Sequence, residues 1–415
     1  MSIRIALEPG AAALLDTLHG AGFAAYAVGG CVRDSLLGRT PHDWDLCTAA
    51  RPEQVMTLFG EARCIPTGLQ HGTVTVKRGG RLYEVTTFRT EGSYSDGRHP
   101  DRVDFVPDVR EDLARRDFTV NAMAYNKEEG LVDPFGGQQD LLARQVLRAV
   151  GEPERRFTED GLRILRLYRF AARLGFEIDP ATGSAARALA GRLVCISAER
   201  IREELCRLLC APRPGAWLEP EVLAQILPEL EPLSCPERLA RVRRLVDGVP
   251  PELPLRLAAL LSPLEEGRVQ TVLRRLRCSN ALTAQATVLV RERGLMPRRE
   301  PEARRVQALR LLGRLGAEPV RRLTLLCAAA CPEQAAAFAA LREEAETLAR
   351  QNACCRVGQL AVNGGDLLAL GIPAGPGLRR ALDALLEQVI TGRTPNRRDA
   401  LLAAARQLDR TDVLR

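Results

Sequence analysis

Two aspartates separated by one residue, Asp43 and Asp45, are the first candidates for chemistry in this 415-residue sequence. They flank Trp44 in HDWDL, and in an extended segment alternate side chains point to the same side, so both carboxylates would project from one face. Paired carboxylates form an oxygen-rich site that suits Mg²⁺, which can activate an attacking hydroxyl and stabilise the leaving oxygens in phosphoryl transfer. Surface turns use the same residues, so the pair alone is a weak signal.

Glu84 is a third candidate because it lies in the β-favouring run RLYEVTTF, where Leu82, Glu84 and Thr86 would share one face. A carboxylate in such a run is not expected to be buried without a partner. It could complete a metal site from a neighbouring strand. The alternative is a charge on an edge strand, which discourages aggregation.

The segment VGGCVRD predicts a place for phosphate groups. Gly29 and Gly30 end an apolar run and allow the backbone to approach a ligand closely. The helix expected to follow would offer free amides and a positive dipole end, with Arg33 one turn in. The pattern is neither a Walker A loop nor a dinucleotide-binding fingerprint, and a tight structural turn would explain the glycines equally well.

A second phosphate candidate is RRDFTVNAMAYN, in which Arg115 and Arg116 precede an apolar segment. Guanidinium groups match phosphate oxygens in bidentate fashion, so this pair would suit a triphosphate. Asp117 or Thr119 could instead simply cap a helix.

The stretch TEDGLRILRLYRFAARLGF, residues 158–176, predicts one amphipathic helix with a basic stripe. At about 100° per residue, the stripe falls within roughly a third of the circumference; it consists of Arg163, Arg166, Arg169 and Arg173. A solvated face with Thr158 as cap and Glu159 paired to Arg163 would explain the first turn. It leaves the other three arginines without a carboxylate at helical spacing.

A functional interpretation of this helix assigns it to base recognition. Asp160 would accept a hydrogen bond from an exocyclic amino group, and Arg163 would donate to the ring nitrogen or carbonyl beside it. Cytosine and adenine both present that arrangement, whereas uracil and guanine reverse it. The two residues could therefore select C and A without a nucleic-acid template.

The elements that must position these residues change in type along the chain. Residues 1 to about 150 alternate helix-like and strand-like patterns, which predicts an α/β unit with a mixed sheet and with function on loops at strand ends. Beyond that point Leu, Ala and Arg dominate and a 3.6-residue period continues to the C-terminus. We therefore predict an α/β domain followed by an all-α region.

Charge and composition permit a polyanionic partner. The 59 basic and 52 acidic residues give a formal charge of +7, and arginines recur densely between Arg268 and Arg322. This middle region is either a solvated helix surface or a surface that follows phosphates. The twelve cysteines include no Cys-x-x-Cys pair, and most of them are interpreted as small buried hydrophobic residues on apolar helical faces. No signal peptide or long apolar run is present, so we expect a reduced, cytoplasmic protein without a membrane partner.

Several of these segments together resemble one enzyme family. VGGCVRDSLLGRTPHDWDL, RRDFTVNAMAYN, DPFGGQQDLLARQVLR, EDGLRILRLYRFAARLGF and ISAERIREEL are similar, in order, to the motifs of the bacterial class II tRNA nucleotidyltransferases, the CCA-adding enzymes. Bacterial poly(A) polymerases share much of this set. The resemblance is specific over residues 20 to about 210, weaker in the arginine-rich middle, and returns in the segment that begins VNGGDLLALGIPAGPGL.

The resemblance implies a nucleotidyltransferase head (1–150), a helical neck that recognises the base (151–212), a helical body (213–335) and a helical tail that binds tRNA (336–415). It implies that Asp43 and Asp45 bind Mg²⁺ and that Glu84 is the third catalytic carboxylate. The nucleotide-binding residues it implies are Gly30, Arg33, Arg116, Asp160, Arg163, Arg166 and Arg169.

The activity implied is Mg²⁺-dependent, template-independent addition of C, C and A from CTP and ATP to the 3′ end of tRNA, with release of pyrophosphate. The alternatives are a poly(A) polymerase, an enzyme that adds only CC or only A, and a non-catalytic RNA-binding protein on the same scaffold. The segment at residues 89–106 resembles the flexible loop of enzymes that switch from C to A, which favours full CCA addition. A homodimer is possible.

Two departures from the family pattern stand out. Gly161 lies where many relatives carry a residue with higher helix propensity or proline, at an expected cost of at most about 1 kcal/mol in a first turn. No histidine follows His99, so we expect this chain to lack the His-Asp metal phosphohydrolase domain that some longer relatives append.

Overall fold

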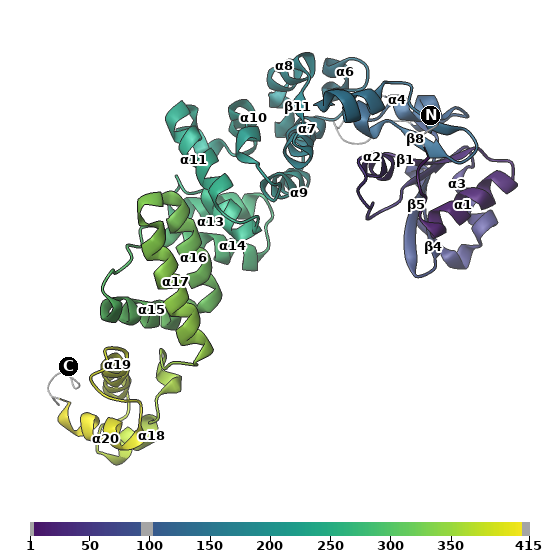
Figure 1. Ribbon diagram of the computed structural model, residues 1–415. Helices are drawn as coiled ribbons and strands as arrows, with labels where there is room; N and C mark the ends of the chain where they lie inside the picture. The colour runs from purple at the N-terminus through teal and green to yellow at the C-terminus, as the bar shows by residue number, and fades with distance from the viewer. Residues whose placement is uncertain (1–3, 93–102, 409–415) are drawn as a thin grey trace. The chain divides into compact units, whose positions relative to one another are not determined.

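The computed structural model describes residues 4–92 and 103–408. The chain forms two compact units (Figure 1). Unit 1 contains Met1–Leu239 and Arg275–Arg277, and unit 2 contains Ala240–Arg274 and Cys278–Arg415. In the described part of the chain, none of the helices has the length and apolar character needed to cross a membrane.

A seven-stranded mixed sheet forms the centre of the N-terminal part of unit 1. All neighbouring strands are antiparallel except β2 and β5, which are parallel. The predicted α/β domain with a mixed sheet is therefore confirmed. In spatial order the strands are β3 (Cys64–Gly68), β4 (Thr73–Arg78), β5 (Arg81–Thr87), β2 (Leu46–Thr48), β1 (Ala25–Val28), β8 (Ala124–Asn126) and β9 (Gly130–Val132).

Short helices cover this sheet because their apolar faces pack on its strands. α1 (Pro9–Gly20) packs on β1 and β2, and α3 (Pro52–Phe59) packs on β4 and β5 (Figure 1). α2 (Gly30–Leu36) follows β1 directly, and α4 (Val109–Ala114) contributes Val109 and Leu113 to a core that includes the fully buried Phe88. The turn at Gly29 and Gly30 and the aspartate pair before β2 are thereby fixed to neighbouring strands.

The strands β6 (Arg89–Glu91) and β7 (Val103–Phe105) form a separate antiparallel pair. They flank most of the segment that resembles a specificity loop. Residues 93–102 of that segment lie outside the described residues.

The remainder of unit 1 is mostly helical, as predicted. Its helices are α5 (Gly137–Gln139), α6 (Pro153–Glu159), α7 (Leu162–Leu174), α8 (Pro180–Ala188), α9 (Ala198–Leu209) and α10 (Pro220–Ile226). One exception is a two-residue strand, β11 (Glu177–Ile178), which pairs in parallel with β10 (Val146–Leu147). Strands this short carry no periodicity that a sequence pattern could detect.

The prediction of one helix over residues 158–176 is wrong. Thr158 lies in the last turn of α6 rather than at a helix start, and Asp160 has extended backbone angles, φ −140° and ψ 105°, that end α6. The Asp160 carboxylate accepts a hydrogen bond from the Leu162 amide at 3.0 Å, which satisfies a free amide at the start of α7. A single extended residue is invisible to a 3.6-residue count.

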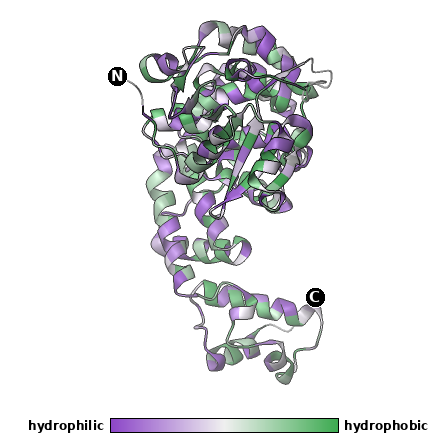
Figure 2. Cartoon of the chain, turned by 90° about the vertical axis from the view of Figure 1, so that its right-hand side faces the viewer, coloured by the Kyte–Doolittle hydropathy of each residue, from purple (hydrophilic) through white to green (hydrophobic). Residues whose placement is uncertain are grey.

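Unit 2 is a set of packed amphipathic helices, and Figure 2 shows green and purple residues alternating along them. Its helices include α12 (Leu253–Leu260), α13 (Glu266–Arg275, whose last residue belongs to unit 1), α14 (Asn280–Arg291), α15 (Pro301–Leu315), α16 (Ala317–Ala330), α17 (Ala335–Arg350), α18 (Gly364–Ala369), α19 (Pro376–Ile390) and α20 (Arg398–Gln407). One core joins α15, α16 and α17, and another joins α18, α19 and α20. The all-α prediction is confirmed for this unit.

All twelve cysteines are free, as predicted. The prediction that most of them are buried is wrong: four, Cys31, Cys47, Cys64 and Cys327, are buried, two, Cys195 and Cys210, are exposed, and the other six are partly exposed.

Candidate active site

Two of the three predicted carboxylates, Asp45 and Glu84, lie side by side where β2 runs beside β5, and Asp43 is two residues before Asp45. Leu46 lies opposite Val85 in this parallel pair, so the residues one position earlier, Asp45 and Glu84, are neighbours on the two adjacent segments. The strand itself begins at Leu46, after the aspartate pair. The expected alternation nevertheless holds, since Asp43 and Asp45 are exposed and Trp44 between them is buried.

The charges of this cluster act on Asp45. Its side chain is open to solvent, yet partial desolvation by the surrounding protein and the negative charges of Glu84 and Asp43 raise the pKa of its carboxyl group. Arg116 opposes this shift. The carboxylates therefore repel one another, and a bound cation would relieve that repulsion.

The three carboxylates suit a Mg²⁺ ion that is also bound by waters and substrate phosphates. Among the described residues, no group of three or more His, Cys, Asp or Glu side chains is gathered closely enough to hold a metal ion by itself. Mg²⁺ is usually bound by one or two carboxylates together with waters and substrate phosphates, rather than in an all-protein cage. Asp43, Asp45 and Glu84 are all exposed and match that mode of binding.

The glycine turn before α2 faces two arginines. Gly29 has φ 77°, which favours glycine, and a Cβ atom on it would lie 2.9 Å from Arg116 Nη1. A Cβ atom on Gly30 would lie 3.8 Å from Arg33 Nη2. Arg116 Nη2 bonds to Asp112 at 3.3 Å, but its buried Nε has no hydrogen-bond partner among the residues that the structure describes. The structure thus brings the predicted turn and both predicted arginines together. Arg33 is already paired with Asp34 at 2.7 Å, so the donor left over for an anion belongs to Arg116.

Arg33 is linked to α7 through two residues that the sequence analysis did not assign to this task. Arg33 Nη1 donates to Asn121 Oδ1 at 2.6 Å, and Asn121 Nδ2 donates to Asp117 Oδ1 at 3.1 Å. Asp117 in turn accepts from Arg166 Nε and Nη2 at 2.9 and 2.6 Å. The sequence analysis considered Asp117 only as a possible helix cap and did not single out Asn121.

Two of the four arginines in the stripe on α7, Arg163 and Arg169, are buried. Arg169 pairs with Glu204 of α9, which also lies 3.7 Å from Arg166. The ring of Phe170 lies 3.8 Å from Arg169 Cζ and 5.4 Å from the Cζ atoms of Arg33 and Arg166. The partners that helical spacing could not supply therefore come from other segments of the chain.

Arg173, at the end of the stripe, differs from the others. Its side chain is 49% exposed, and it lies 3.9 Å from Asp34. It is a surface residue with a weak ion pair.

Asp160 and Arg163 are close in sequence but are not paired with each other. Asp160 accepts from Arg200 Nη2 at 2.7 Å. Arg163 is buried and donates to Glu159 Oε2 at 2.8 Å, the pairing expected of an ordinary first turn. Its Nη2 also donates to the carbonyl oxygen of Arg115 at 2.9 Å, which ties α7 to the segment that carries Arg116.

Close packing explains why position 161 is a glycine. A Cβ atom on it would lie 3.0 Å from both Cβ and the carbonyl oxygen of Arg192. The low cost expected from helix propensity considered only the helix, whereas the neighbouring segment leaves little room for a side chain.

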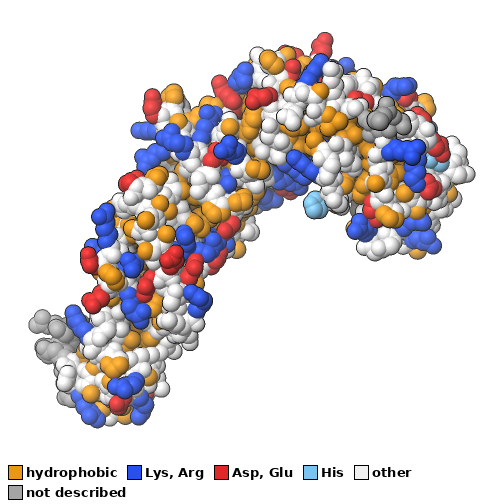
Figure 3. Space-filling view, viewed as in Figure 1, with side chains coloured by type: hydrophobic (Ala, Val, Ile, Leu, Met, Phe, Trp, Pro, Cys, Tyr) orange, Lys and Arg blue, Asp and Glu red, His pale blue; other side chains and the backbone are white. Residues whose placement is uncertain are grey.

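Many arginines of the middle region are paired with carboxylates. Arg321 and Arg322 both bond to Glu252, at 2.7 and 3.0 Å. In Figure 3, blue and red side chains alternate over the helices of unit 2. An ion-paired helix surface accounts for these arginines, whereas a surface that follows phosphates would require unpaired ones.

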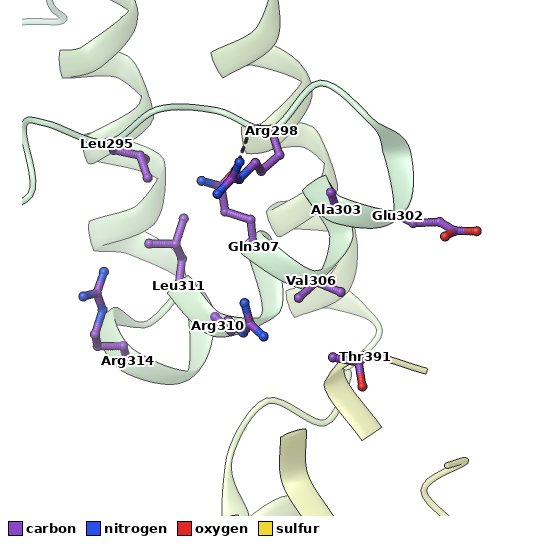
Figure 4. A pocket seen from close by; sticks show the side chains of 10 residues that line it. All are labelled: Leu295, Arg298, Glu302, Ala303, Val306, Gln307, Arg310, Leu311, Arg314 and Thr391. Atoms are coloured by element: carbon purple, nitrogen blue, oxygen red, sulfur yellow. Dashed lines mark hydrogen bonds between the residues drawn. The ribbon is translucent and has the colours of Figure 1, made fainter. Parts of the chain in front are cut away.

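A cavity of about 670 Å³ beside α15 is also lined by arginines that pair with carboxylates (Figure 4). Of the arginines that line it, Arg310 pairs with Glu387 and Arg314 bonds to Glu292 at 2.7 Å. Its other walls include the apolar Leu295 and Val306.

The fold and this cluster of carboxylates, glycines and arginines define a nucleotidyltransferase. Residues 25–148 match the family model described as the poly A polymerase head domain. Residues 175–233 match a probable RNA and SrmB-binding site of polymerase A, and residues 255–405 match a putative tRNA nucleotidyltransferase domain 2.

The chain belongs to the family of CCA-adding enzymes. It is 36% identical over 405 residues to the CCA-adding enzyme of Lactiplantibacillus plantarum, with 95% of each chain covered. It is 37% identical over 410 residues to that of Geobacillus stearothermophilus, with 96% of each covered. Its fold is similar to the crystal structure of the Bacillus stearothermophilus CCA-adding enzyme in complex with CTP, with a TM-score of 0.79, 32% identity and coverage of 98% of this chain and 99% of that one.

Proposed function

We propose that this protein adds C, C and A, from CTP and ATP, to the 3′ end of tRNA without a nucleic-acid template, and that it does so in the cytoplasm. The observation that carries this proposal is the pairing of Asp45 with Glu84 where β2 runs beside β5, with the charge of Asp43 also acting on Asp45, in a head where two arginines face the Gly29 turn. Membership in the family of CCA-adding enzymes supports the choice of tRNA as substrate.

The three carboxylates are proposed to hold Mg²⁺. When bound, Mg²⁺ would supply positive charge to the reacting phosphate and to the attacking and leaving oxygens. Asp43 and Asp45 would hold the 3′-hydroxyl of the tRNA close to the α-phosphate of the nucleotide, and Glu84 would complete the negative cluster. The exposure of all three side chains leaves them free to turn toward a substrate.

The triphosphate is proposed to lie against the turn of Gly29 and Gly30. The amides at this turn can approach phosphate oxygens because no side chain intervenes. Arg116 keeps a buried Nε without a partner, and Arg33 is held toward the turn by Asn121. Both guanidinium groups would bind the phosphates and orient the leaving pyrophosphate.

The base is proposed to be selected by Asp160 and Arg163. Each already has a protein partner, Arg200 for Asp160 and Glu159 for Arg163, so a base would have to share or replace these bonds. Arg166 and Arg169 are already paired with Asp117 and Glu204. We therefore propose that these two arginines position the nucleotide-binding residues rather than contact the nucleotide themselves.

A poly(A) polymerase is the second candidate because the head matches a poly A polymerase model. An enzyme that adds only CC or only A is a variant of the first candidate. The wild-type protein would be incubated with Mg²⁺, CTP, ATP and tRNA that lacks its last three nucleotides, and the extended 3′ ends would be sequenced. Ends that stop after CCA support the proposal, whereas runs of A, or ends that stop at CC, contradict it.

A further inference from the structure

A second cavity lies beside the loop that carries the aspartate pair. Its volume is about 790 Å³, and His42 and Trp44, the two chain neighbours of Asp43, line it. The other walls come from the segment at residues 4–8, from the residues that follow α2, and from Arg81 at the start of β5. Neither the aspartate pair nor the Gly29 turn lines this cavity, so it is distinct from the proposed nucleotide site.

The cavity gathers cationic side chains that lack partners. Arg4, Arg39 and His42 line it, and all three are exposed. Within residues 4–92 and 103–408, their side chains form no hydrogen bond or ion pair. Most arginines of α7 and of the middle region are, in contrast, paired with carboxylates. Unpaired cations in a concave surface favour an anionic ligand.

The one carboxylate in the cavity wall is already engaged. Glu8 accepts from the Tyr83 hydroxyl at 2.7 Å and from the Ala11 amide at 3.0 Å, and it lies 3.6 Å from Arg81. These bonds outweigh the effect of burial and lower the pKa of the Glu8 carboxyl group. Glu8 therefore stabilises the wall and leaves the cavity with a net positive charge.

The other groups suit single-stranded nucleic acid. Trp44, which is 6% exposed, lines the cavity together with Ser35 and Thr40. A ring so deeply buried offers no face for a base, but hydroxyl groups bond to phosphate or ribose, and a positive groove follows the backbone of single-stranded nucleic acid.

We propose that this cavity binds the single-stranded 3′ end of the RNA that is being extended, with Arg39 and His42 on the phosphates that precede the reacting hydroxyl. The inference rests on the proposed function. Consecutive Cα atoms are about 3.8 Å apart, so a strand held at His42 has its end beside Asp43. Contacts to phosphates carry no sequence information, and such a grip remains usable as each added nucleotide changes the end.

The test compares Arg39→Gln, His42→Gln and the double variant with Arg63→Gln. Arg63 is an exposed arginine of the same domain that lies outside the cavity. We expect the double variant to raise the KM for tRNA lacking its last three nucleotides by about tenfold and to lower the salt dependence of tRNA binding by about one charge. KM values for CTP and ATP should stay unchanged, Arg39→Lys should recover part of the loss, and Arg63→Gln should behave as wild type.

Two results would overturn the inference while leaving the proposed function intact. One is an unchanged KM for tRNA in an active double variant. The other is a raised KM for CTP, ATP or, in the reverse reaction, pyrophosphate, without a change for tRNA, which would assign the cavity to free phosphates.

A measurement on the wild-type protein covers the case in which the variants fold poorly. A tRNA with a photoreactive nucleotide next to its 3′ end would be crosslinked and the attachment site mapped by mass spectrometry. A crosslink to the cavity walls, within residues 4–8 or 35–44 or at Arg81, supports the inference, and a crosslink elsewhere contradicts it. A wild-type protein that adds no nucleotide at all would instead refute the proposed function, and the crosslink would still report on the cavity.

Discussion

Arg166 donates two hydrogen bonds to one carboxylate oxygen of Asp117, at 2.9 and 2.6 Å, and so joins α7 to the segment that carries Arg116. Burial alone would raise the pKa of the Asp117 carboxyl group. The positive charge and hydrogen bonds of Arg166, together with the Asn121 amide, outweigh burial and lower this pKa to about 2. The same carboxylate therefore stabilises the folded state and fixes the position of Asn121.

This pair predicts how the stability of unit 1 depends on pH. The pKa of Asp117 is lower in the folded state than the value of about 3.9 in an unfolded chain, so its contribution is present above pH 4 and is lost as the pH falls toward 2. At neutral pH we expect Asp117→Asn to lower the free energy of unfolding by about 2 kcal/mol, and the difference from wild type to shrink below pH 4.

Urea unfolding at several pH values would measure that difference. Both tryptophans, Trp44 and Trp217, belong to unit 1, so tryptophan fluorescence follows this unit alone. A difference that stays constant between pH 7 and pH 3 would show that the Asp117 charge contributes nothing.

The position of Gly137 leads us to expect that alanine there lowers stability, opposite to the effect that helix propensity alone predicts. Replacing a helical glycine by alanine usually stabilises a helix by up to about 1 kcal/mol, but a Cβ atom on Gly137 would lie 2.1 Å from the carbonyl oxygen of Thr119. We expect Gly137→Ala to destabilise unit 1 by about 1–3 kcal/mol. Gly20→Ala is the control, since nothing lies within 4 Å of that position. Equal fluorescence melting curves for the two variants would contradict the close approach.

Because Asn121 holds Arg33, we expect its replacement to weaken nucleotide binding. Asn121→Ala removes the acceptor that holds Arg33 Nη1 at 2.6 Å. We expect the KM for CTP and for ATP to rise by about tenfold, the effect of losing one hydrogen bond to a charged group. Asn126→Ala removes a buried amide from the same sheet, where it bonds to the Ala25 carbonyl oxygen at 3.3 Å. If both variants change the KM equally, the effect reflects general destabilisation rather than Arg33.

Because Arg163 is proposed to select the base, we expect its replacement to weaken the discrimination between nucleotides. If Arg163 reads the base, Arg163→Ala should lower the preference for CTP over UTP, measured as the ratio of kcat/KM values, by at least about tenfold. The affinity for tRNA should change far less. Arg173→Ala is a matched control on the same helix, because that side chain is 49% exposed. An equal loss for all four nucleotides would mean that Arg163 serves only its bonds to Glu159 and the Arg115 carbonyl.

The sequence predicted correctly those features that depend only on neighbouring residues, such as the side to which a side chain points. Alternation predicted that Asp43 and Asp45 face the same side with Trp44 turned inward, and that relation holds. It also allowed Glu84 to approach from a neighbouring strand, because strands place alternate residues on one face. The register that brings Glu84 beside Asp45 is a long-range pairing, which no short segment contains.

Spacing along a single helix likewise could not reveal contacts between residues far apart in the sequence. The partners of Arg166 and Arg169 are Asp117 and Glu204, and these belong to other segments, so a count along one helix could not find them. The break at Asp160 escaped detection because one extended residue barely disturbs the hydrophobic period. Asn121 was missed because its role depends on reaching Arg33 and Asp117 at once.

The most direct test of the central claim is CMP incorporation by the Asp43→Ala, Asp45→Ala double variant into tRNA that lacks its last three nucleotides. We expect a loss of at least about a thousandfold relative to wild type, because the proposed metal site loses two ligands. Asp16→Ala, which removes an exposed carboxylate whose side chain is 66% exposed, should leave the rate unchanged. Incorporation by the double variant at the wild-type rate would contradict the assignment of these aspartates to catalysis.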